Sequence, residues 1–178
     1  MLTDLQKRKL TRMFHVFDTN HDGVLEEVDY LGFADNLVSA RGLAPDSPMR
    51  TELRARYQFV WANLSRATGG KPVTPEVFLG FNDALLADKA NYDRNIAVLV
   101  DTAFKTLDAD GDGKVTLDEY RVYLRAHGLD EKLATEIFPR LDLNGDGHLS
   151  VEEVEKLIHQ FYFSDDPASP GNLVLGPY

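Results

Sequence analysis

The stretch Asp108-Ala-Asp-Gly-Asp-Gly-Lys-Val-Thr-Leu-Asp-Glu119 carries oxygen-bearing side chains at alternate positions of one short segment. Asp108, Asp110 and Asp112 come first, a glycine follows, and Glu119 closes the segment. A calcium ion takes about six to eight oxygen ligands, and a tight loop supplies them when every second side chain points inward. The glycine suits the sharp bend because it adopts backbone angles that a Cβ disfavours. The segment therefore predicts a loop that wraps a calcium ion.

The remaining residues of this segment complete the ligand pattern of an EF-hand, the helix–loop–helix calcium site. Lys114 is expected to offer its backbone carbonyl, and Thr116 its side chain, often through a water molecule. Glu119 is expected to bind with both carboxylate oxygens. Val115 is apolar, and we expect it to pair with a neighbouring loop through a short antiparallel strand.

A second segment, residues 142–153, repeats the pattern. The side chain of His148 is expected to stay off the ion, because calcium prefers oxygen to imidazole, and only its carbonyl is assigned as a ligand. Leu149 is the predicted partner of Val115. The predicted ligands of this loop are Asp142, Asn144, Asp146, His148, Ser150 and Glu153.

The first loop, residues 18–29, follows the same spacing but ends in aspartate. Because the side chain of Asp29 is one methylene shorter than glutamate, closure with two oxygens is harder. A smaller, six-coordinate site follows, so magnesium is expected to compete with calcium chiefly in this loop. The predicted ligands are Asp18, Asn20, Asp22, Val24 through its carbonyl, Glu26 and Asp29.

Residues 65–76 lie where a second loop would stand, but they lack its ligands. If Val73 takes the pairing position, Arg66 stands at the first ligand position and Val77 at the last. A cation and an apolar side chain cannot hold calcium there. We predict a degenerate hand whose strand pairs with Leu25 of the first loop; an ordinary inter-helix loop is the alternative.

The composition narrows the classes of protein that fit. The chain has 178 residues, 43% of them hydrophobic, a net charge of −10 and a pI near 4.9. This charge argues against nucleic acid and anionic membranes as partners. There is no cysteine, no secretory leader and no long apolar run, so we expect a soluble, cytoplasmic protein.

These patterns predict an all-α fold of four EF-hands in two pairs that forms one compact unit. The pairs are assigned to residues 1–90 and 91–163, joined by residues 87–94. The tail, residues 164–178, ends in an apolar run at residues 173–175 that a free segment would have little reason to carry. We therefore expect the tail to fold back and pack between the two halves.

Four hands with the second silent, together with this tail, resemble the sarcoplasmic calcium-binding proteins and their bacterial, calerythrin-like branch. The resemblance implies a compact, cytosolic calcium buffer or transport protein that works as a monomer without catalysis. The coelenterazine photoproteins share the architecture and are a rival that would bind a small ligand. Their cavities are rich in tryptophan, whereas this chain has only Trp61.

A calcium sensor that opens toward a target protein is the alternative to the buffer. Sensors expose a methionine-rich groove, and the only methionines here are Met1, Met13 and Met49. The five histidines are scattered, and no catalytic constellation is recognisable, so we predict no enzyme and no catalytic residue. The sequence favours a buffer with three calcium ions, in the first, third and fourth loops, and identifies no protein target.

Overall fold

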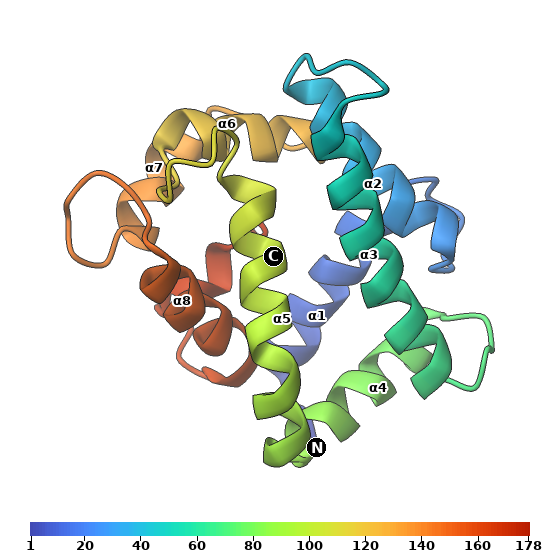
Figure 1. The fold of residues 1–178 in the computed structure, drawn as a ribbon. Coiled ribbons are helices and arrows are strands. Elements are labelled where there is room, and N and C mark those ends of the chain that lie inside the picture. The colour runs from blue at the N-terminus through green and yellow to red at the C-terminus, as the bar shows by residue number, and fades with distance from the viewer.

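The computed structural model covers residues 1–178 and describes the side chains of all of them except residues 91 and 94–96. The chain forms a compact, all-α arrangement (Figure 1). Its elements are α1 (Asp4–Phe17), α2 (Glu27–Ala40), α3 (Pro48–Ala67), α4 (Pro75–Ala87), α5 (Lys89–Leu107), α6 (Leu117–Ala126), α7 (Leu133–Leu141), α8 (Val151–Phe163) and the 3-10 turn η1 (Pro170–Leu173). Among the described residues, none of these helices is long and apolar enough to cross a membrane.

Successive helices form four helix–loop–helix units, and their loops pair in twos. Leu25 forms an antiparallel bridge with Val73, and Val115 forms one with Leu149. The Val115 amide donates to the Leu149 carbonyl at 3.0 Å, and the return bond is 2.8 Å. All four side chains are buried. The predicted fold class and both predicted loop pairings are therefore confirmed.

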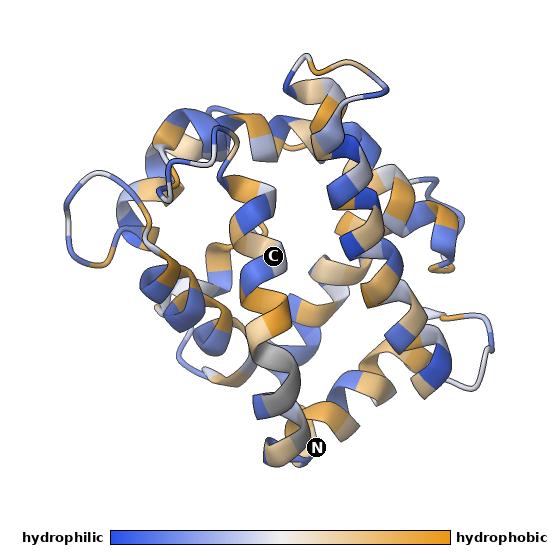
Figure 2. Ribbon diagram, in the orientation of Figure 1, coloured by the Kyte–Doolittle hydropathy of each residue, from blue (hydrophilic) through white to orange (hydrophobic). Residues whose placement is uncertain are grey.

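The helices begin where side-chain oxygens can cap their free amides. Thr3 and Gln6 form a capping box at the start of α1. Ser47 and Thr74 cap α3 and α4, and each is followed by a proline at the first helical position. These starts match the sequence pattern. The hydrophilic residues gather on the loops, as on the one between α7 and α8 (Figure 2).

The predicted link, residues 87–94, runs from the end of α4 into the start of α5. Helix α4 ends at Ala87 and α5 already begins at Lys89, so a single residue separates them. Lys89 pairs with Asp93 one turn later, at 2.7 Å, and such a pair supports a helix. Because no glycine or proline interrupts residues 87–94, the helix has no reason to stop there.

Helix α7 begins after a short turn. The side chain of Asp130 accepts a hydrogen bond from the Lys132 amide at 3.0 Å, but the helix begins at Leu133 with Lys132 as its cap residue. Asp130 therefore fixes the turn before the helix. Pro139 lies inside α7, and the helix ends soon after it at Leu141.

One hydrophobic core runs through both predicted halves. Phe17 of α1 stacks on Tyr30 of α2, with ring centroids 4.8 Å apart, and it lies 4.6 Å from the ring of Phe33. The same buried cluster includes Phe138 of α7 and Phe161 of α8. Burial of apolar area contributes roughly 25 cal/mol per Å². The two halves therefore stabilise each other, and a division after residue 90 stays a prediction.

The tail lies against α8 and α1 and is fixed there by a buried lysine. Lys9 of α1 is fully buried, although lysine is usually a surface residue. Its ammonium donates to the carbonyls of Gln160 and Ser164, at 3.3 and 2.8 Å, and to Oδ1 of Asn172 at 3.0 Å. Three acceptors thus replace the water that the buried charge loses.

Further contacts hold the last turn of the tail. The Tyr120 hydroxyl donates to the Leu173 carbonyl at 3.2 Å, and Nε of Arg12 donates to the Leu175 carbonyl at 3.3 Å. A Cβ placed on Gly171 would lie 2.3 Å from the Leu157 carbonyl oxygen. Only glycine permits this approach, so the tail can lie directly on the backbone of α8.

Candidate metal centres

The third loop arranges its carboxylates around the backbone before any metal is considered. Asp108 follows α5 directly, and its two oxygens accept from the amides of Gly111 and Gly113, at 2.8 and 3.1 Å. Asp110 accepts from the Asp112 amide at 3.1 Å. Carboxylate oxygens of Asp108, Asp110 and Asp112 lie within 4.8 Å of one another. Like charges this close repel, and a divalent cation between them removes the repulsion.

Glu119 closes the third loop from the first turn of α6. One of its oxygens accepts from the Ala109 amide at 2.7 Å, and the other accepts from the amide and hydroxyl of Thr116, at 2.7 and 2.8 Å. The carboxylate thus reaches both ends of the loop, which is where a two-oxygen ligand must stand. Lys114 keeps its amide on Asp112 at 2.8 Å, and we assign its carbonyl as a further ligand.

The fourth loop repeats this geometry between α7 and α8. Asp142 accepts from the amides of Gly145 and Gly147, at 2.7 and 2.8 Å. Glu153 accepts from the Leu143 amide at 2.8 Å and from the Ser150 amide at 3.0 Å, so it also spans the loop. The structure brings oxygens of Asp142, Asp146 and Glu153 within 4.8 Å of one another.

The other predicted residues of the fourth loop lie on its rim. The Asp146 amide donates to Oδ1 of Asn144 at 2.8 Å. Nδ1 of His148 lies 3.0 Å from an Asp146 oxygen, so the imidazole contacts a predicted ligand from outside the loop. The role of the His148 carbonyl as a ligand stays a prediction.

The first loop has the same kind of hydrogen bonds between carboxylates and backbone amides, but its carboxylates are less closely grouped. Asp18 accepts from the amides of Asp22 and Gly23, at 3.2 and 3.1 Å. Asp29 accepts from Thr19 at 3.2 Å and from Glu26 at 2.9 Å, as the glutamates do elsewhere. The structure describes every residue of this loop, and no three of its carboxylates gather within 4.8 Å. This difference agrees with the shorter closing side chain.

Position four of the first loop has a feature that the ligand pattern does not reveal. His21 has a positive φ of 59°, whereas the equivalent residues of the other two loops are Gly111 and Gly145, with φ of 76° and 75°. Histidine pays a steric cost of about 1 kcal/mol or more in this region. The comparison of the three loops in the sequence, glycine twice and histidine once, is the signal that could have identified it.

The loop of the second hand has no ligand set. Helix α3 continues to Ala67, so Arg66, which would stand at the first ligand position, is still helical. The Thr68 hydroxyl donates back to the Leu64 carbonyl at 3.0 Å. With no carboxylate to gather the amides of this loop, the helix simply runs on. The segment keeps only its pairing with Leu25.

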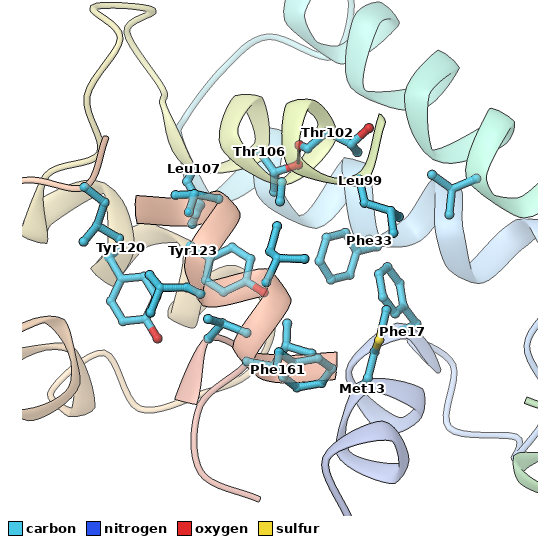
Figure 3. A pocket seen from close by; sticks show the side chains of 18 of the residues that line it. Met13, Phe17, Phe33, Leu99, Thr102, Thr106, Leu107, Tyr120, Tyr123 and Phe161 are labelled. Atoms are coloured by element: carbon cyan, nitrogen blue, oxygen red, sulfur yellow. Dashed lines mark hydrogen bonds between the residues drawn. The ribbon is translucent and has the colours of Figure 1, made fainter. Parts of the chain in front are cut away.

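A cavity of about 150 Å³ lies between the halves, beside the metal loops (Figure 3). It is lined by apolar and aromatic side chains from both halves, including Phe17, Phe33 and Phe161, and by tail residues Val174 and Leu175. Tyrosine hydroxyls and the hydroxyls of Thr102 and Thr106 contribute polar atoms. Burial raises the pKa of Tyr162, one of these tyrosines, to about 12, so its hydroxyl keeps its proton at neutral pH.

Comparison with known proteins agrees with this geometry. Residues 100–159 match the family model of an EF-hand domain pair. Calerythrin from Saccharopolyspora erythraea is 25% identical over 168 residues, covering 92% of this chain and 95% of calerythrin. The luciferin-binding protein of Renilla reniformis is 28% identical over 174 residues, covering 97% of this chain and 92% of that protein. The amphioxus sarcoplasmic calcium-binding protein has the same fold, with a TM-score of 0.72 at 21% identity and full coverage of both chains.

Proposed function

We propose that this EF-hand calcium-binding protein, which resembles calerythrin and the sarcoplasmic calcium-binding proteins and is not an enzyme, serves as a calcium buffer or transport protein. One observation carries the proposal: the surface that a sensor would open to a target is covered by the chain's own tail. Val174 and Leu175 pack into the core between the halves. Lys9 and Arg12 hold the tail there. A protein built this way gains calcium without exposing a groove.

The proposed capacity is three calcium ions, one in each of the first, third and fourth loops. Their ligands are oxygens alone, which suits a hard cation. The third loop supplies four side-chain carboxylates counted with Glu119, and the fourth supplies three. We assign these two loops as the tighter pair because they are joined by the Val115–Leu149 bridge. The first loop is paired with the silent one, so magnesium competes best there.

Titration calorimetry of the metal-free protein with calcium, repeated in millimolar magnesium, tests the stoichiometry. Three ions are expected, with one of them weakened most by magnesium. A dye that binds apolar surface, followed through the same titration, tests the buffer role. Its fluorescence is expected to fall or stay level as calcium is added, and a rise would favour a sensor. We propose that the protein acts as a cytoplasmic monomer.

A second candidate function rests on the cavity between the halves and on the resemblance to a luciferin-binding protein. An aromatic-lined space of this kind suits a flat apolar molecule with a few hydroxyl or carbonyl groups. Equilibrium dialysis with coelenterazine, with and without calcium, distinguishes the two functions. Micromolar binding that calcium changes would favour the small-ligand carrier, whereas no binding would leave the buffer.

A further inference from the structure

The end of the first hand is joined to the start of the third calcium loop by an arginine. Arg41 is the first residue beyond α2, and its Nη2 donates to the carbonyls of Thr106 and Leu107, at 2.6 and 3.2 Å. These carbonyls belong to the last turn of α5, which ends directly before Asp108. The last carbonyls of a helix have no partner within it and carry partial negative charge. A guanidinium therefore stabilises the helix end at this point.

A second arginine makes the reverse contact. Arg125 lies in the last turn of α6, and its Nη2 donates to the carbonyl of Ala40, the last residue of α2, at 3.0 Å. Its Nη1 pairs with Glu131 at 3.1 Å, which holds the guanidinium in place. The exit helix of the first hand is thus fastened to both helices of the third hand.

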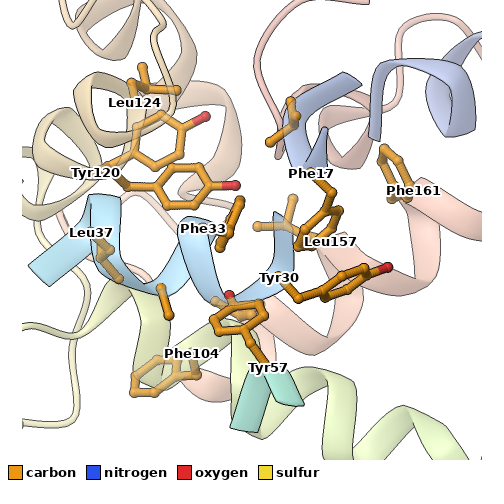
Figure 4. Packing of buried hydrophobic residues seen from close by; sticks show 14 of the residues in the cluster. Phe17, Tyr30, Phe33, Leu37, Tyr57, Phe104, Tyr120, Leu124, Leu157 and Phe161 are labelled. Carbon is orange, nitrogen blue, oxygen red and sulfur yellow. The ribbon is translucent and has the colours of Figure 1, made fainter. Parts of the chain in front are cut away.

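The helices between these two contacts are packed closely. Phe33 of α2 stacks on the ring of His127, with centroids 3.7 Å apart and planes within 11°. Figure 4 shows Phe33 and Leu37 on α2, on the side of that helix that faces Tyr120 and Leu124 of α6. The Tyr57 hydroxyl hydrogen-bonds to Oγ1 of Thr106 at 2.7 Å, in the same turn of α5 that Arg41 contacts. Such an interface moves as a block rather than residue by residue.

The other end of α2 carries the residue that closes the first loop. Asp29 stands in its first turn and is fully buried, with its oxygens on the amides of Thr19 and Glu26. Helix α2 therefore connects Asp29 at one end with Arg41 at the other. Arg41 in turn contacts Leu107, the residue directly before Asp108.

We propose that Arg41 is a positioning residue that couples the first and third calcium loops, so that filling the third loop strengthens calcium binding by the first. Calcium held by Asp108 and Glu119 would join α5 to α6, and the arginine contacts would then hold α2 in place, with Asp29 at the first loop. An ion in the third loop would therefore already order α2. An ion that then enters the first loop would not have to order this helix again. The inference rests on the proposed function, because it requires calcium in both loops.

The loops can be observed separately in the intact protein. The Gly23 amide donates to Asp18 at 3.1 Å, and the Gly113 amide donates to Asp108 at the same distance. Each hydrogen bond ends on a predicted ligand, so the amide NMR signals of Gly23 and Gly113 report calcium in the first and third loops. Calcium titrations of four proteins form the experiment: the wild type, Glu119→Gln, which disables the third loop, Arg41→Gln, and the double variant.

In the wild-type background, Glu119→Gln is expected to weaken calcium binding at Gly23 by about fivefold or more. In the Arg41→Gln background, the same change is expected to alter binding at Gly23 by less than about twofold. If Glu119→Gln weakens calcium binding at Gly23 equally in the wild-type and Arg41→Gln backgrounds, the coupling role of Arg41 is wrong. A purely structural loss would affect both backgrounds alike. If Gly23 never responds to calcium in the wild type, the proposed ion in the first loop is wrong, and the coupling fails with it.

Arg54→Gln is the matched control. Arg54 pairs with Asp35 of α2 at 2.5 Å, so this variant removes the same charge from a contact within the first half. In the Arg54→Gln background, Glu119→Gln is still expected to weaken calcium binding at Gly23 by about fivefold. If that effect disappears, removal of a positive charge is sufficient, whichever contact the arginine makes. If Arg41→Gln does not fold, Arg41→Lys keeps a cation but lacks the planar fork that reaches two carbonyls. It is expected to give an intermediate effect, and full wild-type coupling would contradict the proposed geometry.

Discussion

Replacing Lys9 with methionine tests how the tail is held, and it has a distinctive dependence on pH. The variant keeps the length of the side chain but removes the ammonium that contacts Gln160, Ser164 and Asn172. The Gln160 carbonyl keeps its bond from the Ser164 amide, so the Ser164 carbonyl and the Asn172 side chain lose most, and a buried acceptor left without a partner costs about 1–3 kcal/mol. Because the variant also avoids burying a charge, we expect a net loss of about 2–3 kcal/mol in the free energy of unfolding at pH 7.

The pH dependence follows from the lowered pKa of this lysine. Burial lowers the pKa of Lys9 from 10.5 to about 8, while the nearby Asp165 opposes part of that effect. Between these values the unfolded chain holds a proton that the folded chain has released, so this group makes the protein more stable as pH rises. At about 1.4 kcal/mol per pH unit, the advantage of the wild type over Lys9→Met should grow by about 2 kcal/mol between pH 7 and pH 9.5.

Urea unfolding of the calcium-saturated proteins, followed by the fluorescence of Trp61, provides the assay. Taking the difference between the two proteins cancels the tyrosines and other groups that titrate in the same range. Lys7→Met is the control, since Lys7 lies exposed on the same helix beside Asp4. A difference between wild type and Lys9→Met that stays flat or shrinks as pH rises would refute the reasoning.

Four further changes test other parts of the structure. Asp29→Glu should raise the preference of the first loop for calcium over magnesium about tenfold, measured by competition calorimetry, and weaker calcium binding would contradict the geometric argument. Burial lowers the pKa of His127 from 6.5 to about 3, so the wild type should lose about 2 kcal/mol more than His127→Phe between pH 7 and pH 5, by urea unfolding; equal losses would mean that the imidazole titrates normally. Deleting residues 164–178 should lower the melting temperature of the calcium-loaded protein by several degrees and increase the binding of an apolar-surface dye, and Gly171→Ala should do the same to a smaller extent. An unchanged melting temperature and unchanged dye binding would show that the tail carries no stability.

The loops and their pairing could be predicted because their chemistry is local. Six ligand positions in twelve residues, a glycine at the bend and an apolar residue beside it leave little freedom in how the segment folds. The caps at Thr3, Ser47 and Thr74 are equally local, since each serine or threonine serves an amide three residues away.

The contacts between distant segments could not be predicted in the same way. On a helical pattern, Lys9 indicates a solvent-exposed face, and only Ser164 and Asn172, far along the chain, make its burial acceptable. Arg41 likewise looks like an ordinary residue after a helix until the end of α5 is placed beside it. Their partners lie 155 and 65 positions away, beyond any periodicity that a sequence window detects.

The burial of Lys9 also has a consequence for how the protein is made. The acceptors for the Lys9 ammonium, at residues 160–172, leave the ribosome well after α1, the first of them 151 positions later in the chain. Until then Lys9 stays in water and the aromatic side chains beside it lack their cover. Both halves are therefore present before the core between them can close, and closure depends on the slow formation of long-range contacts. During that interval the first calcium loop is accessible to calcium, while residues 164–178 are not yet packed against α1.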